Sequence, residues 1–210
     1  MNQDFRPKKA QLIMTLRGMG ILDSAALAAL EQVPRELFVP QALRAHSYEN
    51  ASLPIACDQT ISQPYIVARM TEALQLKGRE LVLEIGCGSG YQAAVLAHLC
   101  RRVYSIERLK PLLVDAENRL RDLRISNISF RLGDGAKGWP EVAPFDRIIL
   151  TCGCDEIPEI LLQQLKIGGI MVAPEGNGKA QQLVVVTRHE SAVVRKALMP
   201  VTFVPLIEGE

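Results

Sequence analysis

LVLEIGCGSG, residues 81–90, is the stretch of sequence that decides the fold. Its first half, LVLEI (81–85), is a short apolar run, and its second half, GCGSG (86–90), carries glycine at alternate positions. Glycine lets the backbone bend sharply and lets a ligand lie close to the main chain. The pattern therefore predicts a buried strand that ends in a tight turn and leads into a helix.

Apolar runs alternate with helical patterns along the rest of the chain. Further strands are expected at residues 102–106, 128–132, 147–151 and 170–174, and helices at 89–99, 109–123 and 157–165, the last closed by Gly168–Gly169. Residues 183–188 and a final run through VTFVPLI (201–207) are expected as late strands, with a hairpin as one arrangement. Continuous apolar strands between helices are typical of a parallel sheet that is covered on both faces. We therefore expect an α/β fold with a doubly wound, mostly parallel, Rossmann-like sheet.

The chain before this region has a different character. Residues 7–33 predict two short helices separated by Gly18–Gly20, with Ser24 as the cap of the second. VPRELFVP (33–40) and SLPIACDQTISQP (52–64) predict a proline-punctuated, largely irregular approach to the next helix. At 210 residues one domain is expected, 1–210, with 1–78 as a helical N-terminal extension and substrate loop and 79–210 as the cofactor-binding sheet.

Composition narrows the classes of protein. Apolar residues make up 48% and charged residues 22%, as in ordinary globular proteins, and the net charge is +1. Such a balance gives no overall electrostatic field that would attract nucleic acid or a membrane surface. No apolar run approaches the roughly 20 residues that span a bilayer. We also expect no signal peptide, and the odd count of five cysteines indicates reduced thiols in a cytoplasm. A monomer is the simplest expectation.

Acidic residues lie at the ends of three successive expected strands. Glu84 ends the first strand, Glu107 ends the second, and Asp134 follows the third in the sequence GDG. A carboxylate at the second position can accept both hydroxyls of a ribose, and an acid at the third can accept the exocyclic amine of adenine. Together with the glycine turn, these acids indicate a cofactor that contains adenosine.

The spacing of the turn distinguishes two such cofactors. Dinucleotide-binding loops have the spacing G-x-G-x-x-G and a helix N-terminus that is free for pyrophosphate. Here the third glycine, Gly90, comes one residue early, and Glu84 precedes the loop. A carboxylate in that position repels phosphate but suits the ammonium of a methionine moiety. The balance favours S-adenosylmethionine over NAD, and hence methyl transfer.

The segment DQTISQPYIVARM (58–70) places polar residues in front of an apolar helix. Pro64 suits the first helical position, so Gln59 to Gln63 should lie at the positive, hydrogen-bond-donating end of the helix. Two interpretations remain open from the residues alone. Either Ser62 or Gln63 is a simple helix cap, or the group binds an anion.

Seven stretches carry a resemblance to a known family. They are VPRELFVP, LPIACDQTISQPYIVARM, VLEIGCGSGYQAAVLAHL, VYSIER, GDGAKGWPEVAPFDRI, IPEILLQQLKIGGIMVAPEG and FVPL. In order and spacing they resemble the protein-L-isoaspartate O-methyltransferases over nearly the whole chain. The resemblance implies transfer of a methyl group from S-adenosylmethionine to the α-carboxyl of L-isoaspartyl residues, with S-adenosylhomocysteine as the product. Isoaspartyl peptides and aged or unfolded proteins would be the partners, and the ester then collapses to a succinimide.

The resemblance also implies roles for individual residues. Ser62 would be the active-site hydroxyl. The cofactor would be held by residues from the polar pentad, the glycine turn, the strand ends and the start of a late strand: Gln59, Thr60, Ile61, Glu84, Gly86, Gly88, Ser89, Glu107, Arg108, Asp134, Gly135 and Gln181. Ala56 and Asp58 depart from the family, which commonly has glycine there, and Asp58 adds a negative charge near a carboxylate substrate. Cys152-Gly153-Cys154 replaces small residues and Glu175 an apolar one.

The chemistry expected of Ser62 is modest. A sulfonium donor and an ionised carboxylate acceptor need no general base at neutral pH, so exclusion of water and in-line placement are the useful contributions. Ser62 and free N–H groups at the helix start would orient the acceptor without a covalent intermediate.

Three alternatives stay open at this point. One is a methyltransferase of the same fold with another acceptor, and a second is a nucleotide-binding module without methyl transfer. The third is that oxidation of Cys57, Cys87, Cys152 or Cys154 closes the site; otherwise these side chains are apolar fillers.

No metal site is expected, because two thiols at Cys152 and Cys154 fall short of a zinc ligand set.

Overall fold

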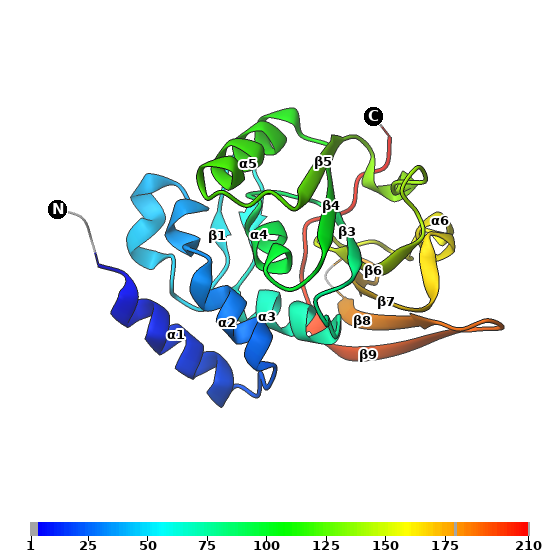
Figure 1. The fold of residues 1–210 in the computed structure, drawn as a ribbon, viewed down its shortest axis with the longest axis horizontal. Coiled ribbons are helices and arrows are strands. Elements are labelled where there is room, and N and C mark those ends of the chain that lie inside the picture. The colour runs from blue at the N-terminus through cyan, green and yellow to red at the C-terminus, as the bar shows by residue number, and fades with distance from the viewer. Residues whose placement is uncertain (1–3, 179, 210) are drawn as a thin grey trace.

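A seven-stranded sheet forms the centre of the molecule (Figure 1). The structure is a computed structural model, and it describes residues 4–178 and 180–209. The strands are β3 (Leu81–Ile85), β4 (Arg102–Glu107), β5 (Ile128–Leu132), β6 (Phe145–Leu150), β7 (Leu165–Glu175), β8 (Gln181–Arg188) and β9 (Val193–Val201). Their order in space is β5-β4-β3-β6-β7-β8-β9. The first five in this order run parallel, whereas β8 and β9 pair antiparallel at one edge. The predicted mostly parallel, doubly wound fold is confirmed.

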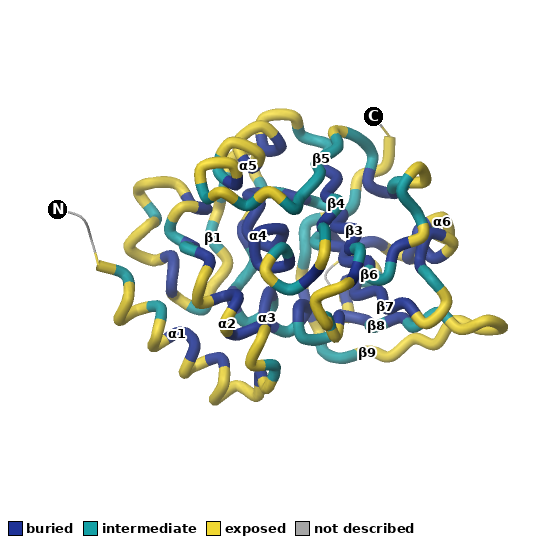
Figure 2. Tube along the Cα trace, viewed as in Figure 1, coloured by how far each residue is buried: buried dark blue, intermediate teal, exposed yellow. Residues whose placement is uncertain are grey.

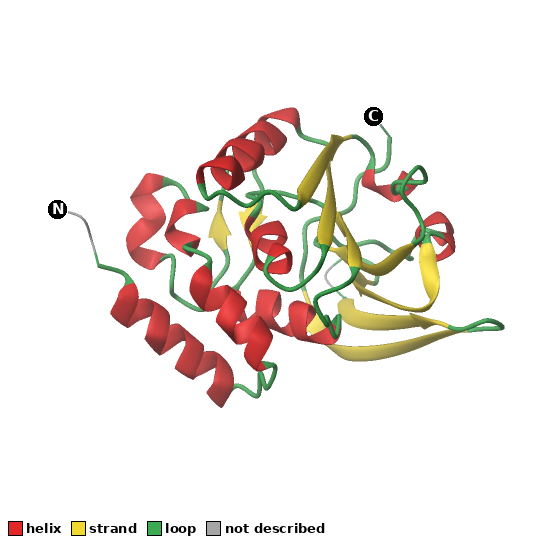
Figure 3. Cartoon of the chain, viewed as in Figure 1, coloured by secondary structure: helices red, strands yellow, loops and turns green. Residues whose placement is uncertain are grey.

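Helices cover both faces of the sheet, and Figure 3 shows most of them gathered on the N-terminal side. The α-helices are α1 (Arg6–Gly18), α2 (Ser24–Gln32), α3 (Pro64–Ala73), α4 (Tyr91–Ala97), α5 (Lys110–Asp122) and α6 (Glu159–Gln163). Short 3-10 helices are η1 (Arg35–Leu37), η2 (Gln41–His46) and η3 (Gly135–Lys137). Among the described residues, none of these helices has the length and hydropathy to cross a membrane.

Alternate residues of the central strands enter two separate apolar clusters. Val82 of β3 and Ile149 of β6 pack with α1 to α5, whereas Leu83 and Ile148 pack on the opposite face with α6. Successive side chains of a strand point to opposite faces, so a strand that is apolar at every position is buried on both. Figure 2 shows this buried centre, and it shows the outer side of α1 and the far end of the β8–β9 hairpin as exposed.

The second helix begins as expected but with a different cap. Asp23 is the N-cap of α2, and its carboxylate accepts hydrogen bonds from the N–H groups of Ala25 and Ala26 at 2.9 and 3.1 Å. Ser24 is already the first helical residue, so its prediction as the cap was wrong. Asp23 has the extended backbone that an N-cap needs, with a side chain short enough to reach the amides of the first turn.

The late part of the chain differs from the predictions in two places. Gly168 and Gly169 lie inside the long strand β7 instead of closing a helix, and α6 is correspondingly short. The hairpin pairs β8 with β9, and β9 ends at Val201. The exposed β9 has no apolar run that would predict it. Beyond Val201, residues 202–207 of VTFVPLI form no strand and contain one isolated bridge, Gly153 to Pro205.

The region before α3 is largely irregular, as predicted, but it contains a small hairpin of β1 (Leu53–Pro54) and β2 (Thr60–Ile61). Its turn is closed by a hydrogen bond from Gln59 N to Ala56 O of 3.3 Å. Both central residues, Cys57 and Asp58, have positive φ, of 59° and 56°. A two-residue turn of this kind matches the twist of a hairpin, and it brings the residues that follow Asp58 to the end of the sheet.

Candidate functional site

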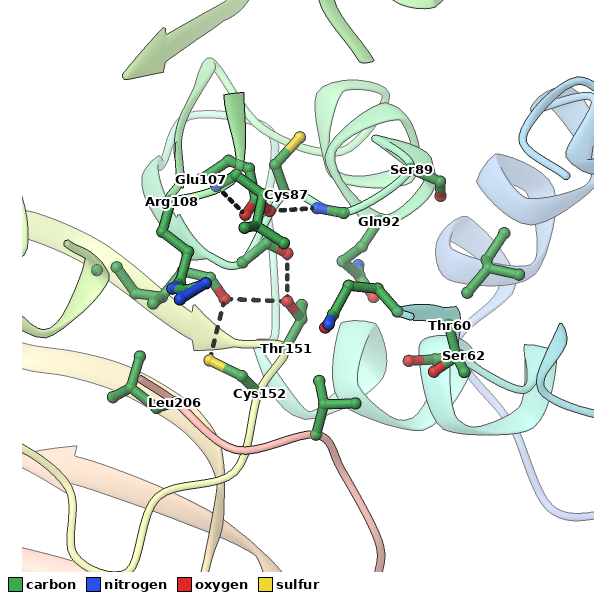
Figure 4. Close-up of a pocket in the computed structure, with 18 of the residues that line it drawn as sticks. Thr60, Ser62, Cys87, Ser89, Gln92, Glu107, Arg108, Thr151, Cys152 and Leu206 are labelled. Atoms are coloured by element: carbon green, nitrogen blue, oxygen red, sulfur yellow. Dashed lines mark hydrogen bonds between the residues drawn. The ribbon is translucent and has the colours of Figure 1, made fainter. Parts of the chain in front are cut away.

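A cavity of about 360 Å³ opens at the carboxyl ends of β3, β4 and β6. In the sheet β3 lies between β4 and β6, so the chain leaves this point in opposite directions. Ligands of doubly wound sheets bind at such a switch point. Figure 4 shows Glu107, Arg108 and Thr151 on one side of the cavity and Thr60 and Ser62 on the other.

The glycine turn forms the floor of the cavity. Gly86 has a φ of +94°, and a Cβ there would lie 2.6 Å from Thr151 Oγ1. Gly90 also has a positive φ, and its missing side chain lets the turn lie against Ala116 of α5. The Thr151 hydroxyl donates to Ile85 O at 2.9 Å and also contacts Gly86 O. The turn is thus held by the residue that follows β6, which the sequence did not single out as functional.

Glu107 is the best placed of the predicted acids. Its carboxylate accepts hydrogen bonds from Gly88 N at 2.8 Å and from Leu109 N at 2.9 Å, and the residue is only 6% exposed. It therefore lies fixed against the turn with lone pairs left over for a ligand. Arg108 lines the cavity beside it, and its buried Nε has no hydrogen-bond partner among the described residues.

Most of the predicted site residues come together on the cavity wall, although they derive from four parts of the chain. Those that line it are Gln59, Thr60, Ile61, Ser62, Gly86, Gly88, Ser89, Glu107, Arg108 and Gly135. Three others, Glu84, Asp134 and Gln181, do not line it. In this structure, these three side chains lie outside the cavity wall.

Glu84 lies beneath the turn, fully buried, next to Ser105. Burial raises the pKa of its carboxyl to about 8; the hydrogen bond from Ser105 opposes this shift and the nearby Glu107 adds to it. Its Oε1 has no partner among the described residues. The charged form of this carboxyl is therefore disfavoured unless a cation lies close by.

Asp134 and Gln181 hold the C-terminal segment. Asp134 accepts hydrogen bonds from Ala136 N and, at 3.0 Å, from Gly209 N. Gln181 accepts from Phe203 N at 2.7 Å and donates to Phe203 O at 3.3 Å. These contacts place residues 204–207 along the cavity wall. The sequence offered FVPL as a resemblance but gave no sign that this segment closes the site.

Ser62 lies at the other side of the cavity, between β2 and α3. Pro64 is the first residue of α3, as predicted, and Gln63 is its N-cap without a side-chain cap bond. The first available amide of the helix, Tyr65 N, donates to Asn50 Oδ1 at 3.0 Å. The prediction of free N–H groups at this helix start was therefore wrong for Tyr65, because the side chain of Asn50, which lies outside the helix, already accepts its hydrogen bond.

Apolar side chains make up much of the rest of the cavity wall. Ile61, Val67, Met70 and Ile106 contribute to its wall. Asp58, which is exposed, lies at its edge, and no salt bridge to it occurs within the described parts of the chain.

The cysteines near the cavity are poor nucleophiles. Burial is the main cause that raises the pKa of Cys87 and of Cys152 well above the ordinary value of a thiol. The thiolate is the form that oxidants and electrophiles attack, so these buried thiols favour the interpretation as apolar fillers. In residues 4–178 and 180–209 no group of three or more His, Cys, Asp or Glu side chains is arranged to hold a metal ion.

Comparison with known proteins agrees with this geometry. The family model for protein-L-isoaspartate(D-aspartate) O-methyltransferase matches residues 7–210. A protein-L-isoaspartate O-methyltransferase of Parvibaculum lavamentivorans is 55% identical over 205 residues, which cover 96% of this chain and 92% of the relative. The Maricaulis maris protein of that name is 54% identical over 204 residues, with 97% and 96% covered.

Solved structures add the fold. A protein-L-isoaspartate O-methyltransferase superposes with a TM-score of 0.84 at 30% identity, over 94% of this chain and 65% of that chain. A Plasmodium falciparum beta-aspartate methyltransferase in complex with S-adenosyl-L-homocysteine has a TM-score of 0.82 at 24% identity, with 95% and 98% covered, and shows the same fold. The match of the family model and the identity to the curated relatives show that this chain belongs to the protein-L-isoaspartate(D-aspartate) O-methyltransferase family.

Proposed function

We propose that this chain transfers a methyl group from S-adenosylmethionine to the α-carboxyl of L-isoaspartyl residues in damaged proteins, and so starts their repair. The observation that carries the proposal is that one cavity unites the turn at the end of β3 with Ser62 at the start of α3. A donor held at the turn and an acceptor held at Ser62 would therefore meet inside a single apolar site.

The cofactor half of the site fits an adenosyl group. Glu107 is fixed by two backbone amides and would accept the ribose hydroxyls, while Gly86, Gly88 and Ser89 allow close approach of the ligand to the main chain. Arg108 and Gly135 would border the base. Glu84 would act from beneath the turn, where a ligand ammonium would favour its charged form. When bound, S-adenosylmethionine supplies an electrophilic methyl group on a sulfonium.

The acceptor half needs little chemistry. A peptide carboxylate is already ionised at neutral pH, so Ser62 has no proton to remove. Its hydroxyl would hold one carboxylate oxygen and leave the other free to face the donor, while Gln59, Thr60 and Ile61 form the wall between the two ligands. Apolar side chains such as Val67 and Met70 keep water out of this space, which favours a step in which opposite charges cancel.

Asp58 supports a second candidate, a methyltransferase that acts on a different acceptor. Its exposed carboxylate at the edge of the cavity repels an anionic substrate and would favour an acceptor with a neighbouring cation.

Transfer of a labelled methyl group to a peptide with one isoaspartyl residue tests the proposal, with the aspartyl isomer as control. We expect label only in the isoaspartyl peptide. If the chain binds S-adenosylmethionine but labels neither peptide, the second candidate, a methyltransferase with a different acceptor, would remain. Calorimetry with S-adenosylhomocysteine and with NAD tests the remaining alternative, a nucleotide-binding module without methyl transfer. That alternative predicts that only NAD gives heat of binding.

We further propose that the whole chain works as one domain, as a monomer, in the cytoplasm. The helices α1 to α3 share an apolar cluster with one face of the sheet, which supports a single unit. All five cysteines are free, as a reducing compartment requires. The net charge of +1 gives no reason to expect nucleic acid as a partner. Sedimentation at several concentrations would test the monomer.

A further inference from the structure

Arg35, the first residue of η1, is a fully buried cation behind the segment that carries Ser62. Its Nε donates to Ser47 O at 2.9 Å and its Nη2 donates to Ser62 O at 2.8 Å. No carboxylate lies within salt-bridge distance of it among the described residues, and its Nη1 has no hydrogen-bond partner there. The guanidinium thus donates hydrogen bonds to two main-chain carbonyls, one of which belongs to the proposed active-site serine.

Such an arrangement is costly for the fold. A charge that leaves water without an opposite charge loses much of its solvation free energy, and burial accordingly lowers the pKa of Arg35. A neutral side chain of similar size would fill the space at a lower cost. The planar fork of arginine, however, can reach two carbonyls in fixed directions at the same time, which a single ammonium group does not do.

Arg35 is also one end of a stack that reaches the glycine turn. Its Cζ lies 4.8 Å from the centroid of the Tyr91 ring, and Tyr91 packs edge-on against Phe38, with 5.4 Å between ring centroids. On the far side, Arg119 lies over Phe38 at 5.5 Å, and its Nη1 donates to Ser89 O at 2.6 Å. Two guanidinium groups at the ends of an aromatic pair therefore each donate to a carbonyl of the cavity wall, Arg35 to Ser62 O and Arg119 to Ser89 O.

The two carbonyls belong to the two halves of the cavity. Ser89 is part of the turn at the end of β3, and Ser62 lies where the acceptor is proposed to bind. Contacts between aromatic rings and guanidinium groups are packed and directional, so the stack fixes the separation of the two loops. Methyl transfer depends on in-line placement of donor and acceptor within a fraction of an ångström. A stack that holds the two loops apart at a fixed distance therefore affects how the acceptor lies relative to the donor.

We propose that Arg35 is a positioning residue for methyl transfer: it sets the backbone of Ser62, and the Arg35–Tyr91–Phe38–Arg119 stack holds that backbone at a fixed distance from the cofactor turn. The role rests on the proposed function, because it has meaning only where Ser62 orients an acceptor. It predicts that Arg35 acts through the Ser62 hydroxyl and contributes nothing to turnover once that hydroxyl is gone.

A double-mutant cycle tests this role, with single-turnover methyl transfer to the isoaspartyl peptide as the readout. Arg35→Lys keeps the charge but not the two-carbonyl fork, and we expect it to lower the rate by about 10- to 100-fold with the Kd for S-adenosylhomocysteine changed less than about twofold. In a Ser62→Ala background the same substitution should have no further effect on the rate. An equal fall in both backgrounds would overturn the proposal, because it would show a general structural role.

Arg102→Lys is the matched control. Arg102 also lies over an aromatic ring, that of Tyr104 at 5.9 Å, and donates to Ser129, but it is remote from the cavity. We expect it to leave the rate unchanged in both backgrounds. Phe38→Leu extends the test if Arg35→Lys folds poorly, since both arginines remain: a rate loss that disappears in Ser62→Ala supports the stack, and a loss of equal size contradicts it. Lack of turnover in the unsubstituted chain would instead contradict the proposed function.

Discussion

Ser62 is the residue on which the account depends most. Its side chain makes no cap bond to α3, since Gln63 is the N-cap and lacks a side-chain bond, and the helix amide at Tyr65 is served by Asn50. The capping alternative that the sequence left open is therefore not the one that the structure favours. What remains for the hydroxyl is to face the cavity that it lines.

Ser62→Ala should separate chemistry from stability. We expect methyl transfer to fall by about 10²-fold, because one preorganised donor to the acceptor is lost. The melting temperature should stay within about 2 °C, because no helix cap is removed. Ser52→Ala, at an exposed position of the same region, is the control and should change neither quantity. A loss of about 1 kcal/mol of stability with turnover intact would instead indicate a cap.

Glu84 predicts a pH dependence of stability. Burial raises its pKa in the folded chain to about 8, from an ordinary value of 4.5. The folded state therefore holds this proton more tightly than the unfolded state, so the stability it contributes is complete below about pH 4.5 and is lost as the pH rises to about 8. Glu84→Gln keeps a neutral side chain at every pH. It should raise the free energy of unfolding by at least about 1 kcal/mol at pH 8.5 and leave it unchanged near pH 4.5.

Urea unfolding at the two pH values measures this difference. The exposed Glu117→Gln on α5 is the control, for which no pH-dependent gain is expected. A loss of stability in Glu84→Gln at pH 8.5 would show that the carboxylate is charged and well satisfied in the free protein, contrary to the structure.

At the scale of elements, the turn between β1 and β2 carries strain. Cys57 has a φ of 59°, in the left-handed region that costs an ordinary residue about 1 kcal/mol but costs asparagine less. We expect Cys57→Asn to raise the free energy of unfolding by about 0.5 to 1 kcal/mol. Ala56→Gly in the same turn is the matched control; Ala56 has no positive φ, so glycine there should lower stability by a similar amount. A fall in the free energy of unfolding for Cys57→Asn, alongside the expected fall for Ala56→Gly, would rule out the strain.

The elements also show what a sequence can predict. β3, the glycine turn and Glu107 were predictable because a buried parallel strand is apolar throughout and its loop must accommodate a ligand. The cap of α2 was misplaced by one residue, since Asp23 and Ser24 are both good caps and only backbone geometry distinguishes them. β9 was missed because it is an exposed edge strand whose pairing with β8 leaves no apolar pattern.

At the scale of the whole molecule, the site is assembled from distant parts of the chain. Residues 59–62, the strand ends in the middle, and residues 204–207 near the C-terminus all line the same cavity. The acids at the strand ends were predictable from their register, whereas the C-terminal wall was not. Its position depends on contacts from distant parts of the chain, among them Gln181, which bonds to the main chain of Phe203, and Gly153, whose backbone bonds to Val204 and Leu206. Long-range contacts of this kind leave no periodic signal in the sequence.

Gln181→Ala tests this link between the ends of the molecule. Removal of the amide leaves the main chain of Phe203 without its partner, which should cost about 1 to 3 kcal/mol of stability. We also expect the Kd for S-adenosylhomocysteine to rise several-fold, because residues 204–207 lose one of the contacts that hold them, although the backbone bonds to Gly153 remain. Gln182→Ala, at the adjacent exposed position, is the control and should alter neither. An unchanged Kd in a destabilised Gln181→Ala variant would show that the C-terminal wall does not depend on this side chain.

The central claim is that donor and acceptor meet in one cavity, with Ser62 beside the acceptor. A crystal structure of this chain with S-adenosylhomocysteine and an isoaspartyl peptide tests it most directly, through the distance between Ser62 Oγ and the peptide α-carboxyl. The account predicts one carboxylate oxygen within about 3.2 Å of Ser62 Oγ and the other in line with the cofactor sulfur. A cofactor outside the cavity, or an acceptor carboxyl far from Ser62, would contradict it.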